Sequence, residues 1–485
     1  MIIKDFLSRY NLRYPRSLVY MLQASEYNPR DYFVWYRRTK NFNFVEKRGR
    51  FTKTRKAILL LTIAWLIILP VYIGNFFLFT RTDYFSGEFG SFLRYPIFFF
   101  IMLAAPYFLA YGIVIPLIIV KFFIQRPIEY FIIKRAKRKL KRHKALKIAV
   151  AGSFGKTSMR EILKAVLSEG KKVAAASRNH NTPLGISRFI DSLFGDEEVL
   201  IFEFGEYYPG DIRKLCDLVQ PEIGVITGIN EAHLKKFKKI ERTVKTVYEL
   251  ADYLGGKPVY VNGENNLARE NARFGHILYN REGVGDWTIE NLKTNLNGTS
   301  FVLIKTDKRI EFSSGLFGLH QAGPLAAAAD IALSIGLSFD QVNAGVSKTK
   351  SFDHRLELKI DSAGVITLDD SYNGNPDGVR ATIEFLAFLK DHRRFFVTPG
   401  LVEMGAQTEE VHRQIGKDLA KAEIEKIVLI KNSVTSYIEE GLKESGYESE
   451  ILRFPDAFSA FAALPHLTVK GDIVLLQNDW PDQYQ

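Results

Sequence analysis

The clearest chemistry in the sequence lies in seven consecutive residues, GSFGKTS. All seven are predicted to contact a nucleotide: Gly152, Ser153, Phe154, Gly155, Lys156, Thr157 and Ser158. Glycines let backbone N–H groups close around phosphate oxygens, a lysine neutralises the terminal phosphates, and a threonine hydroxyl can ligate Mg²⁺. The spacing departs from the pattern G-x-x-x-x-G-K-[ST] only in having Val150 at the first glycine position. The segment therefore predicts a phosphate loop.

A carboxylate and an imidazole follow two strand-like runs nearby. Glu203 lies at the end of VLIFEF, and EIGVIT leads through GIN to Glu231 and His233. In parallel sheets, ligands bind outside the carboxyl ends of the strands, and oxygen and nitrogen donors suit a divalent metal. Each residue alone is an ordinary polar group at a strand end. Taken with the loop, Glu203 and His233 predict a second metal position.

Strand and helix signals alternate around the loop. Apolar runs typical of strands occur at residues 146–150, 172–176, 199–204 and 222–227. Helical patterns lie between them, at residues 157–169, 184–193 and 211–219. This βαβ order predicts an α/β fold, with a phosphate-loop-type central domain whose mostly parallel sheet is covered on both faces.

Two long apolar runs precede this region. Residues 57–80 and 95–120 contain no charged side chain, and each exceeds the roughly 20 residues needed to cross a bilayer. A buried helix of a soluble protein usually carries a polar stripe, which these runs lack. We therefore expect a hairpin of two transmembrane helices.

The net charge of +12 is concentrated beside these runs. Basic residues lie between positions 47 and 56 and between 121 and 147, whereas the connecting segment, RTDYFSGEFGSFLR, is balanced. Positive charge favours the cytoplasmic side, so both termini are expected there. Anionic lipid headgroups explain the basic stretch at 134–147 better than nucleic acid, which is not an expected partner.

Composition excludes two broad classes of protein. The chain has 485 residues, 47% of them apolar and 25% charged, which is enough for about three domains and excludes overall disorder. Cys216 is the single cysteine. An internal disulfide is thus impossible, and the chain suits a reducing compartment.

Eight sequence blocks, taken together, point to one family. They are GSFGKTS, RNHNTPLG (178–185), EFGEYYPGD (203–211), INEAHL around His233, GLHQAGPLAAAA (318–329), HRLE (354–357), DDSYNGNP (369–376) and PGLVEMG followed by His412. From Leu146 to about Asp472 the chain resembles the Mur ligases, ATP-dependent amide-forming enzymes of bacterial cell-wall synthesis. It is most similar to the members that add D-alanyl-D-alanine.

The resemblance implies a central ATP-binding domain and a Rossmann-like C-terminal domain that closes over it. It implies that Lys156, Glu203 and His233 are catalytic and that Thr157, Glu203 and His233 ligate Mg²⁺. The implied nucleotide contacts outside the loop are Arg355, Asp370, Tyr372 and Asn373; the implied substrate contacts are Asn181, Thr182 and Asn375. For the residues around N-G-N-P the simpler interpretation is turn chemistry.

These features divide the chain into five parts. We expect a cytoplasmic amphipathic segment, two transmembrane helices, a basic juxtamembrane linker, a central ATP-binding domain and a C-terminal domain, at residues 1–55, 56–121, 122–145, 146–350 and 351–485.

Several positions depart from the family pattern. The lysine that is carbamylated in the family and bridges to Mg²⁺ aligns with Val247, and Lys245 lies about 200° away on a helix. The asparagine that contacts adenine aligns with Pro324, three positions after Gln321 in the same block. A Lys-Gly-Ser near the C-terminus is replaced by residues 477–479, Gln-Asn-Asp.

The N-terminal segment replaces the UDP-binding domain of typical relatives. It contains LQASEYNPRDYFVWYRR, which we interpret as an amphipathic helix at the membrane interface, with Trp35 and nearby tyrosines as anchors. In a more specific alternative, this segment and the two apolar runs hold the ligase beside a membrane-associated acceptor such as a lipid-linked muropeptide.

The leading hypothesis is a ligase anchored in the bacterial cytoplasmic membrane. It would use ATP and Mg²⁺ to join a muramyl-peptide or related carboxylate to D-alanyl-D-alanine or another amine through an acyl phosphate. One alternative is a ligase for another polymer, such as a poly-amino-acid capsule. Another is a non-catalytic membrane-anchored relative that binds nucleotide without turnover.

Overall fold

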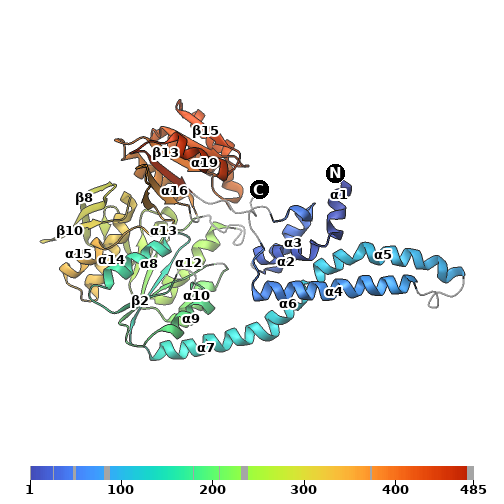
Figure 1. Cartoon of the computed structure of the whole chain (residues 1–485). Coiled ribbons are helices and arrows are strands. Elements are labelled where there is room, and N and C mark those ends of the chain that lie inside the picture. The colour runs from blue at the N-terminus through green and yellow to red at the C-terminus, as the bar shows by residue number, and fades with distance from the viewer. Residues whose placement is uncertain are drawn as a thin grey trace. The chain divides into compact units, whose positions relative to one another are not determined.

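The computed structural model describes residues 2–25, 27–46, 51–80, 88–177, 180–206, 208–230, 239–371, 374–402 and 404–477. It contains two compact units, one formed by residues up to 131 and the other beginning at residue 132 (Figure 1). The second unit holds two β-sheets.

The first sheet has ten strands in the order β10-β9-β8-β7-β6-β5-β4-β1-β3-β2. Its parallel half consists of β1 (Leu146–Ala151), β2 (Val173–Ala175), β3 (Val199–Glu203), β4 (Ile223–Ile226), β5 (Val259–Asn262) and β6 (Ile277–Asn280). Strand β1 lies between β3 and β4, with Ile148 opposite both Ile201 and Ile223. The predicted parallel sheet is confirmed.

The remaining strands of this sheet form an antiparallel extension. They are β7 (Gly283–Val284), β8 (Trp287–Asn295), β9 (Gly298–Lys305) and β10 (Lys308–Ser314). The expected βαβ series did not include them.

Helices cover both faces of the parallel half, as predicted. One face packs against α8 (Lys156–Leu167), α14 (Ala322–Ser334) and α15 (Phe339–Ser347); the other packs against α9 (Pro183–Ser192), α10 (Asp211–Val219) and α12 (Ile240–Leu254). Helix α13 (Asn266–Glu270) follows β5. Alternate residues of β1 enter opposite cores: Ile148 and Val150 one, Ala149 and Ala151 the other. This burial on both faces explains the continuous apolar run.

The second sheet has six strands in the order β11-β12-β16-β13-β14-β15. Its strands are β11 (Glu357–Ile360), β12 (Ile366–Asp370), β13 (Arg394–Thr398), β14 (Lys426–Ile430), β15 (Glu450–Phe454) and β16 (Ile473–Gln477), and only β11 pairs antiparallel. The helices between them are α16 (Pro376–Ala387), α17 (Thr408–Lys421), α18 (Thr435–Glu444) and α19 (Ala457–Leu467). This is the expected Rossmann-like arrangement.

The first unit consists of helices joined by short irregular segments, with no strand among its described residues. It comprises α1 (Ile2–Leu7), α2 (Tyr14–Ala24), α3 (Pro29–Arg38), α4 (Arg55–Thr80), α5 (Glu88–Gly112) and α6 (Val114–Val120). A π-helical segment at residues 121–125 continues into α7 (Arg126–Arg142), whose Ala136 and Leu140 pack in the second unit.

The N-terminal segment is not the single amphipathic helix that we expected. Helices α2 and α3 share a core with the hairpin, in which Tyr32 and Tyr36 are buried. The Tyr14 hydroxyl donates to the carbonyl of Pro106 at 3.1 Å, and the Tyr32 hydroxyl donates to that of Ala110 at 2.9 Å. These tyrosines therefore join the segment to α5 rather than serving as surface anchors, because a buried hydroxyl needs an acceptor.

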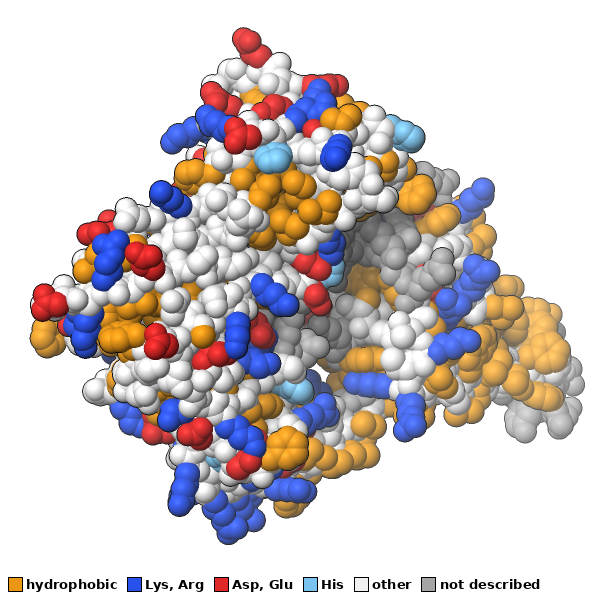
Figure 2. Space-filling model, turned by 60° about the vertical axis from the view of Figure 1, so that its left-hand side comes forward, with side chains coloured by type: hydrophobic (Ala, Val, Ile, Leu, Met, Phe, Trp, Pro, Cys, Tyr) orange, Lys and Arg blue, Asp and Glu red, His pale blue; other side chains and the backbone are white. Residues whose placement is uncertain are grey.

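In the part of the chain that the structure describes, two helices are long and apolar enough to cross a membrane by length and composition, Arg55–Phe77 and Tyr95–Arg142. The surface of the hairpin exposes many large hydrophobic side chains, which gather as a patch in Figure 2; they include Leu66, Phe76, Phe99, Phe100 and Phe108. Such a surface is typical of a membrane-facing or partner-facing segment.

Candidate phosphate-binding site

The predicted phosphate loop connects β1 to α8 at the carboxyl edge of the parallel strands. Gly152 has φ +145° and Gly155 has φ +77°, conformations that favour glycine. A Cβ at Gly152 would lie 2.2 Å from Oγ1 of Thr227, which follows β4. Thr227 donates from that oxygen to the carbonyl of Phe154 at 2.5 Å. Gly152 is thus required by the close approach of the loop to the end of β4, and Gly155 by its positive φ.

Some backbone N–H groups of the loop donate hydrogen bonds within the protein, whereas others belong to the first turn of α8. Ser153 N and Phe154 N donate to the carbonyl of Gly228 at 2.7 and 3.3 Å. No side chain of the described residues caps α8, so the N–H groups of its first turn can receive an anion. The buried Ser153 hydroxyl has no hydrogen-bond partner among those residues. These groups fit a phosphate.

Lys156 lies within the loop and is almost fully enclosed. Its Nζ donates to the carbonyl of Gly152 and, at 3.5 Å, to that of Ser153. It also donates to both carboxylate oxygens of Glu206, at 3.2 and 2.9 Å. The ammonium group is thereby held where terminal phosphates would bind.

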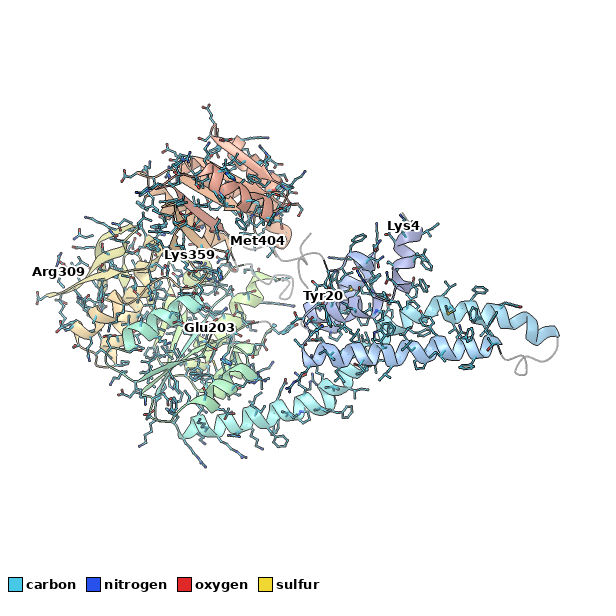
Figure 3. All side chains as sticks on the ribbon, in the orientation of Figure 1. Lys4, Tyr20, Glu203, Arg309, Lys359 and Met404 are labelled. Atoms are coloured by element: carbon cyan, nitrogen blue, oxygen red, sulfur yellow. The ribbon has the colours of Figure 1, made fainter. Side chains whose placement is uncertain are left out.

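Thr157 and Glu203 meet as the sequence predicted. The Thr157 hydroxyl donates to Oε2 of Glu203 at 3.0 Å, and Arg160 Nη1 donates to the same oxygen at 3.1 Å. Glu203 ends β3 and lies inside the domain, where Figure 3 labels it. A hydroxyl and a carboxylate side by side can supply oxygen ligands to Mg²⁺.

The predicted substrate residues Asn181 and Thr182 lie next to the chain that follows β3. The Asn181 carbonyl accepts from Gly205 N at 2.9 Å, and a Cβ at Gly205 would lie 2.9 Å from that carbonyl oxygen. Thr182 caps α9 by accepting from Gly185 N at 3.2 Å. The structure therefore brings Asn181 close to the segment that carries Glu203 and Glu206.

Asn375 lies between the two sheet domains. Its Oδ1 caps α16 by accepting from Gly378 N at 3.0 Å, and it accepts from Asn230 Nδ2 at 3.3 Å. Asn230 follows β4 in the central domain. Asn375 thus caps a helix and, in addition, joins the C-terminal domain to the strand edge near the loop.

Asp370 ends β12 and is buried. Its Oδ2 accepts from Gln477 Nε2 at 3.1 Å, and Gln477 occupies the first position of the altered Lys-Gly-Ser segment. Burial raises the pKa of Asp370 to about 6, and the charge of Arg355 opposes that rise. Arg355 itself lies between two non-glycine residues with positive φ, His354 at 58° and Leu356 at 45°, a strained backbone of the kind found at functional sites.

Some predicted residues lie outside the described residues. These are His233, Tyr372 and Asn373, together with Asn478 and Asp479. The proposed contribution of His233 to the metal position therefore stays a prediction, as do the nucleotide contacts of Tyr372 and Asn373.

The two positions of α12 that were compared with the carbamylated lysine of the family differ in burial. Val247 is fully buried on α12, whereas Lys245 is exposed on the same helix. Lys245 thus points away from the sheet, as the helical geometry predicted. Pro324 lies in the first turn of α14 and Gln321 immediately precedes that helix.

Sequence reasoning assigned no role to Glu206, Arg160 or Thr227. Glu206 is buried and pairs with Lys156, Arg160 pairs with Glu203, and Thr227 braces the loop. The sequence offered one indication for Glu206, because this residue belongs to the same block, EFGEYYPGD, as Glu203. Arg160 looked like an ordinary polar residue of a helix, and its partner follows from tertiary packing alone.

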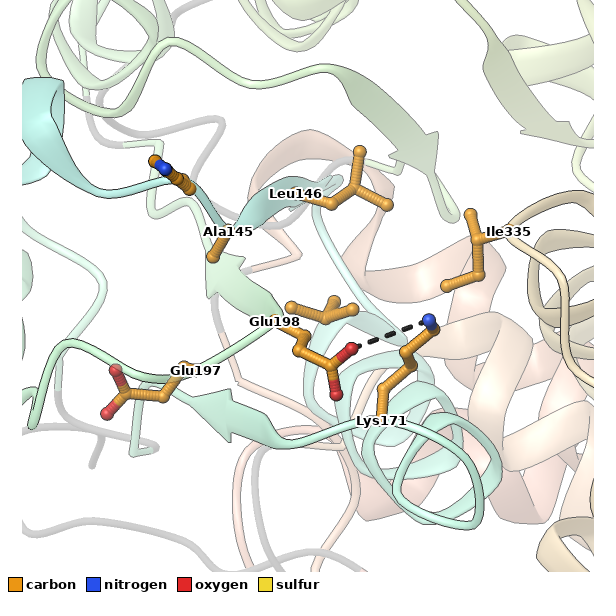
Figure 4. A pocket seen from close by; sticks show the side chains of 8 residues that line it. Ala145, Leu146, Lys171, Glu197, Glu198 and Ile335 are labelled. Carbon is orange, nitrogen blue, oxygen red and sulfur yellow. Dashed lines mark hydrogen bonds and ion pairs between the residues drawn. The ribbon is translucent and has the colours of Figure 1, made fainter.

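Two other features do not form the site. A pocket lined by Leu146, Lys171 and Glu198 (Figure 4) lies at the amino ends of β1 and β3, opposite the edge that carries the loop. His354, Glu357 and Asp369 could together hold a metal, but Lys359 Nζ lies 2.8 Å from Glu357 and 3.2 Å from Asp369 and already supplies a cation.

Comparisons with known proteins agree with the fold. The Mur ligase middle domain matches residues 150–332, and the Mur ligase, glutamate ligase domain matches residues 354–477. UDP-N-acetylmuramoyl-tripeptide–D-alanyl-D-alanine ligase of Escherichia coli (strain K12) is 27% identical over 293 residues, which cover 58% of this chain and 64% of that protein. The chain thus spans just under two thirds of the length of that relative.

Two solved structures share the fold. MurF from Acinetobacter baumannii aligns with a TM-score of 0.63 at 21% identity, covering 72% of this chain and 77% of the other. MurF from Thermotoga maritima in complex with ADP aligns with a TM-score of 0.63 at 23% identity, covering 72% and 80%. Residues 1–149 lie outside both family matches.

Proposed function

Because this chain belongs to the Mur ligase family, we propose that it is an ATP-dependent ligase. It joins a muramyl-peptide carboxylate to the amine of D-alanyl-D-alanine in peptidoglycan precursor synthesis. The observation that carries this proposal is the set of polar contacts beyond the ends of β1 and β3, in which Thr157 donates to the buried Glu203 and the partly buried Lys156 pairs with Glu206. The substrates follow from the names of relatives, which are UDP-N-acetylmuramoyl-tripeptide–D-alanyl-D-alanine ligases.

The site residues fit ATP and Mg²⁺. Among the described residues the Ser153 hydroxyl has no hydrogen-bond partner and the start of α8 has no side-chain cap; both, with Lys156, suit phosphate oxygens. Thr157 and Glu203, with His233 as a further candidate, would hold Mg²⁺, which supplies charge neutralisation on the phosphates. In the C-terminal domain, Asp370 and Arg355 would contact the nucleotide, with Tyr372 and Asn373 as further candidates.

The chemistry explains why such groups are needed. A carboxylate is a poor electrophile, so its oxygen first takes the γ-phosphoryl group of ATP, giving an acyl phosphate and ADP. The amine then attacks the carbonyl carbon, phosphate leaves, and the amine loses a proton. Lys156 and the helix N-terminus stabilise the negative charge that develops on phosphoryl oxygens. Arg160 keeps Glu203 oriented throughout.

Acceptor-dependent release of ADP by the detergent-purified full chain tests this proposal. Synthetic muramyl-tripeptide and D-alanyl-D-alanine should give ADP, phosphate and a product heavier by the dipeptide less one water. Lys156→Ala should abolish release, while Lys164→Ala, at an exposed position of the same helix, should not. Full activity of Lys156→Ala refutes the proposal.

The same assay separates the alternatives. Turnover only with other carboxylates and amines would indicate a ligase for another polymer, such as a poly-amino-acid capsule. Nucleotide binding without turnover on any acceptor would indicate a non-catalytic relative.

We also propose that α4 and α5–α6 anchor the ligase in the bacterial cytoplasmic membrane, with both termini and the sheet domains cytoplasmic. The length and apolar composition of the helices and the flanking basic residues support this assignment. The domain boundaries at 55, 121, 145 and 350 are part of the proposal. Anchoring would keep the enzyme near lipid-linked acceptors.

A further inference from the structure

Glu206 forms an ion pair in the space that a nucleotide must approach. It lies three residues after Glu203, and both of its carboxylate oxygens accept from Lys156 Nζ. The side chain of Glu206 is 2% exposed and that of Lys156 is 13% exposed. The pair is therefore largely removed from water, where a charge is costly unless a partner compensates it.

Nucleotide binding changes the surroundings of Glu206, on the proposed function that the loop holds ATP. When ATP binds, Lys156 must donate some of its hydrogen bonds to phosphate oxygens instead of to Glu206. Whatever else Glu206 contacts, this transfer withdraws positive charge from a buried carboxylate and brings a polyanion close to it. Two anions in a buried site repel each other strongly.

Glu203 does not face the same difficulty. Arg160 Nη1 donates to it at 3.1 Å, and the guanidinium group is itself buried. Because an arginine stays charged in proteins, Glu203 keeps a cation whether or not nucleotide is present. A redirection of Lys156 toward phosphate therefore affects the ion pair of Glu206 and leaves that of Glu203 in place.

We propose that Glu206 is a ligand of a divalent cation that enters with the nucleotide, and that its pairing with Lys156 disfavours ATP that arrives without the cation. A carboxylate oxygen is the ligand that Mg²⁺ and Mn²⁺ prefer. The cation takes over the compensation that Lys156 provided. Nucleotide and cation binding are then coupled, and the coupling is reciprocal.

Titration calorimetry on the full chain in detergent tests the coupling, with a non-hydrolysable ATP analogue in EDTA or in excess MgCl₂. The unaltered chain should bind the analogue about 100-fold more weakly in EDTA, near the upper end of usual coupling. Glu206→Gln should reduce that ratio to about tenfold or less by removing the buried charge. Glu169→Gln is the matched control, since Glu169 also accepts from a lysine, Lys348, with both oxygens, at the far end of α8.

Mn²⁺ binding, followed by electron paramagnetic resonance with the analogue present, tests direct ligation. Glu206→Gln should weaken at least one bound Mn²⁺ by about tenfold or more. Unchanged Mn²⁺ affinity would overturn ligation by Glu206. If Glu206→Gln fails to fold, Glu206→Asp decides, because it keeps the charge and shortens the ligand: Mg²⁺ dependence should persist, and Mn²⁺ binding should weaken.

The possible failures are distinguishable. No binding of the analogue by the unaltered chain in either buffer overturns the proposed function, and this inference with it. Binding with an Mg²⁺ dependence that Glu206→Gln leaves unchanged overturns the inference alone. Proton uptake on binding in EDTA with undiminished affinity also overturns it, because a proton would then neutralise Glu206.

Discussion

Arg281 and Glu384 form a two-point ion pair between the two sheet domains. Arg281 follows β6, and its Nη1 and Nη2 donate to the two carboxylate oxygens of Glu384 on α16 at 2.7 and 2.8 Å. Arg281 Nε also donates to Glu264 at 3.0 Å. This fork geometry fixes orientation as well as distance. The pair therefore favours one relative position of the two sheet domains.

Glu384→Gln should loosen the contact between the domains without unfolding either. Both side chains are about one third exposed, so solvent screening limits the loss of unfolding free energy to at most about 1 kcal/mol. Trypsin should cleave the connecting segment at Lys350 or Arg355 several times faster in the variant. Glu410→Gln, at an exposed position on α17, is the control; equal cleavage rates in both variants would contradict the role of the pair.

Gly152→Ala should disrupt the loop itself. The new Cβ would collide with Thr227 Oγ1 in a conformation that side chains rarely adopt, so we expect a loss of about 2–3 kcal/mol in unfolding free energy and loss of ATP binding. Gly195→Ala is the control, because its φ of +103° is similarly unfavourable but nothing lies within 4 Å. It should cost only about 1–2 kcal/mol of strain and retain ATP binding. ATP binding by Gly152→Ala would show that this glycine is dispensable.

The sequence was most informative where one local rule decided the structure. The strand–glycine–helix pattern correctly predicted β1, the loop and α8, because glycine conformation and helix start signals are local. Thr157 and Glu203 could be paired because parallel strands end at one edge of a sheet. The predicted helix at 211–219 coincides with α10.

Other features depend on packing between distant segments. Tyr14 and Tyr32 look like interfacial aromatics, but they are buried because carbonyls of α5 accept their hydroxyl protons. The pairing of Lys156 with Glu206 requires the chain after β3 to turn back toward the loop, a turn that no composition signal indicates. The antiparallel strands β7–β10 come after the recognisable βαβ pattern in the chain and were not predicted.

Asp370→Asn should change how stability depends on pH. Burial raises the pKa of this carboxyl from 3.8 to about 6. Its contribution to stability is therefore fully present below the unfolded pKa and is lost as pH rises through about 6. Between pH 4 and pH 7 the wild type should lose up to about 3 kcal/mol relative to Asp370→Asn. Melting temperatures across this range measure the difference; a constant offset between the two proteins would contradict it.

Single introduced cysteines should report the membrane topology without background. The native Cys216 is buried, and burial raises the pKa of its thiol to about 12, so it carries almost no reactive thiolate. Ser86→Cys lies in the segment that connects the two apolar runs, and Ser347→Cys is exposed at the end of α15.

In intact spheroplasts, a membrane-impermeant maleimide should label Ser86→Cys but not Ser347→Cys, because positive charge flanking the spans places both termini inside. After lysis it should label both variants, and the unaltered chain should stay unlabelled in either state. Labelling of Ser347→Cys before lysis would show that the orientation is the reverse of the one expected. Protection of both cysteines before lysis would show that the hairpin does not cross the bilayer.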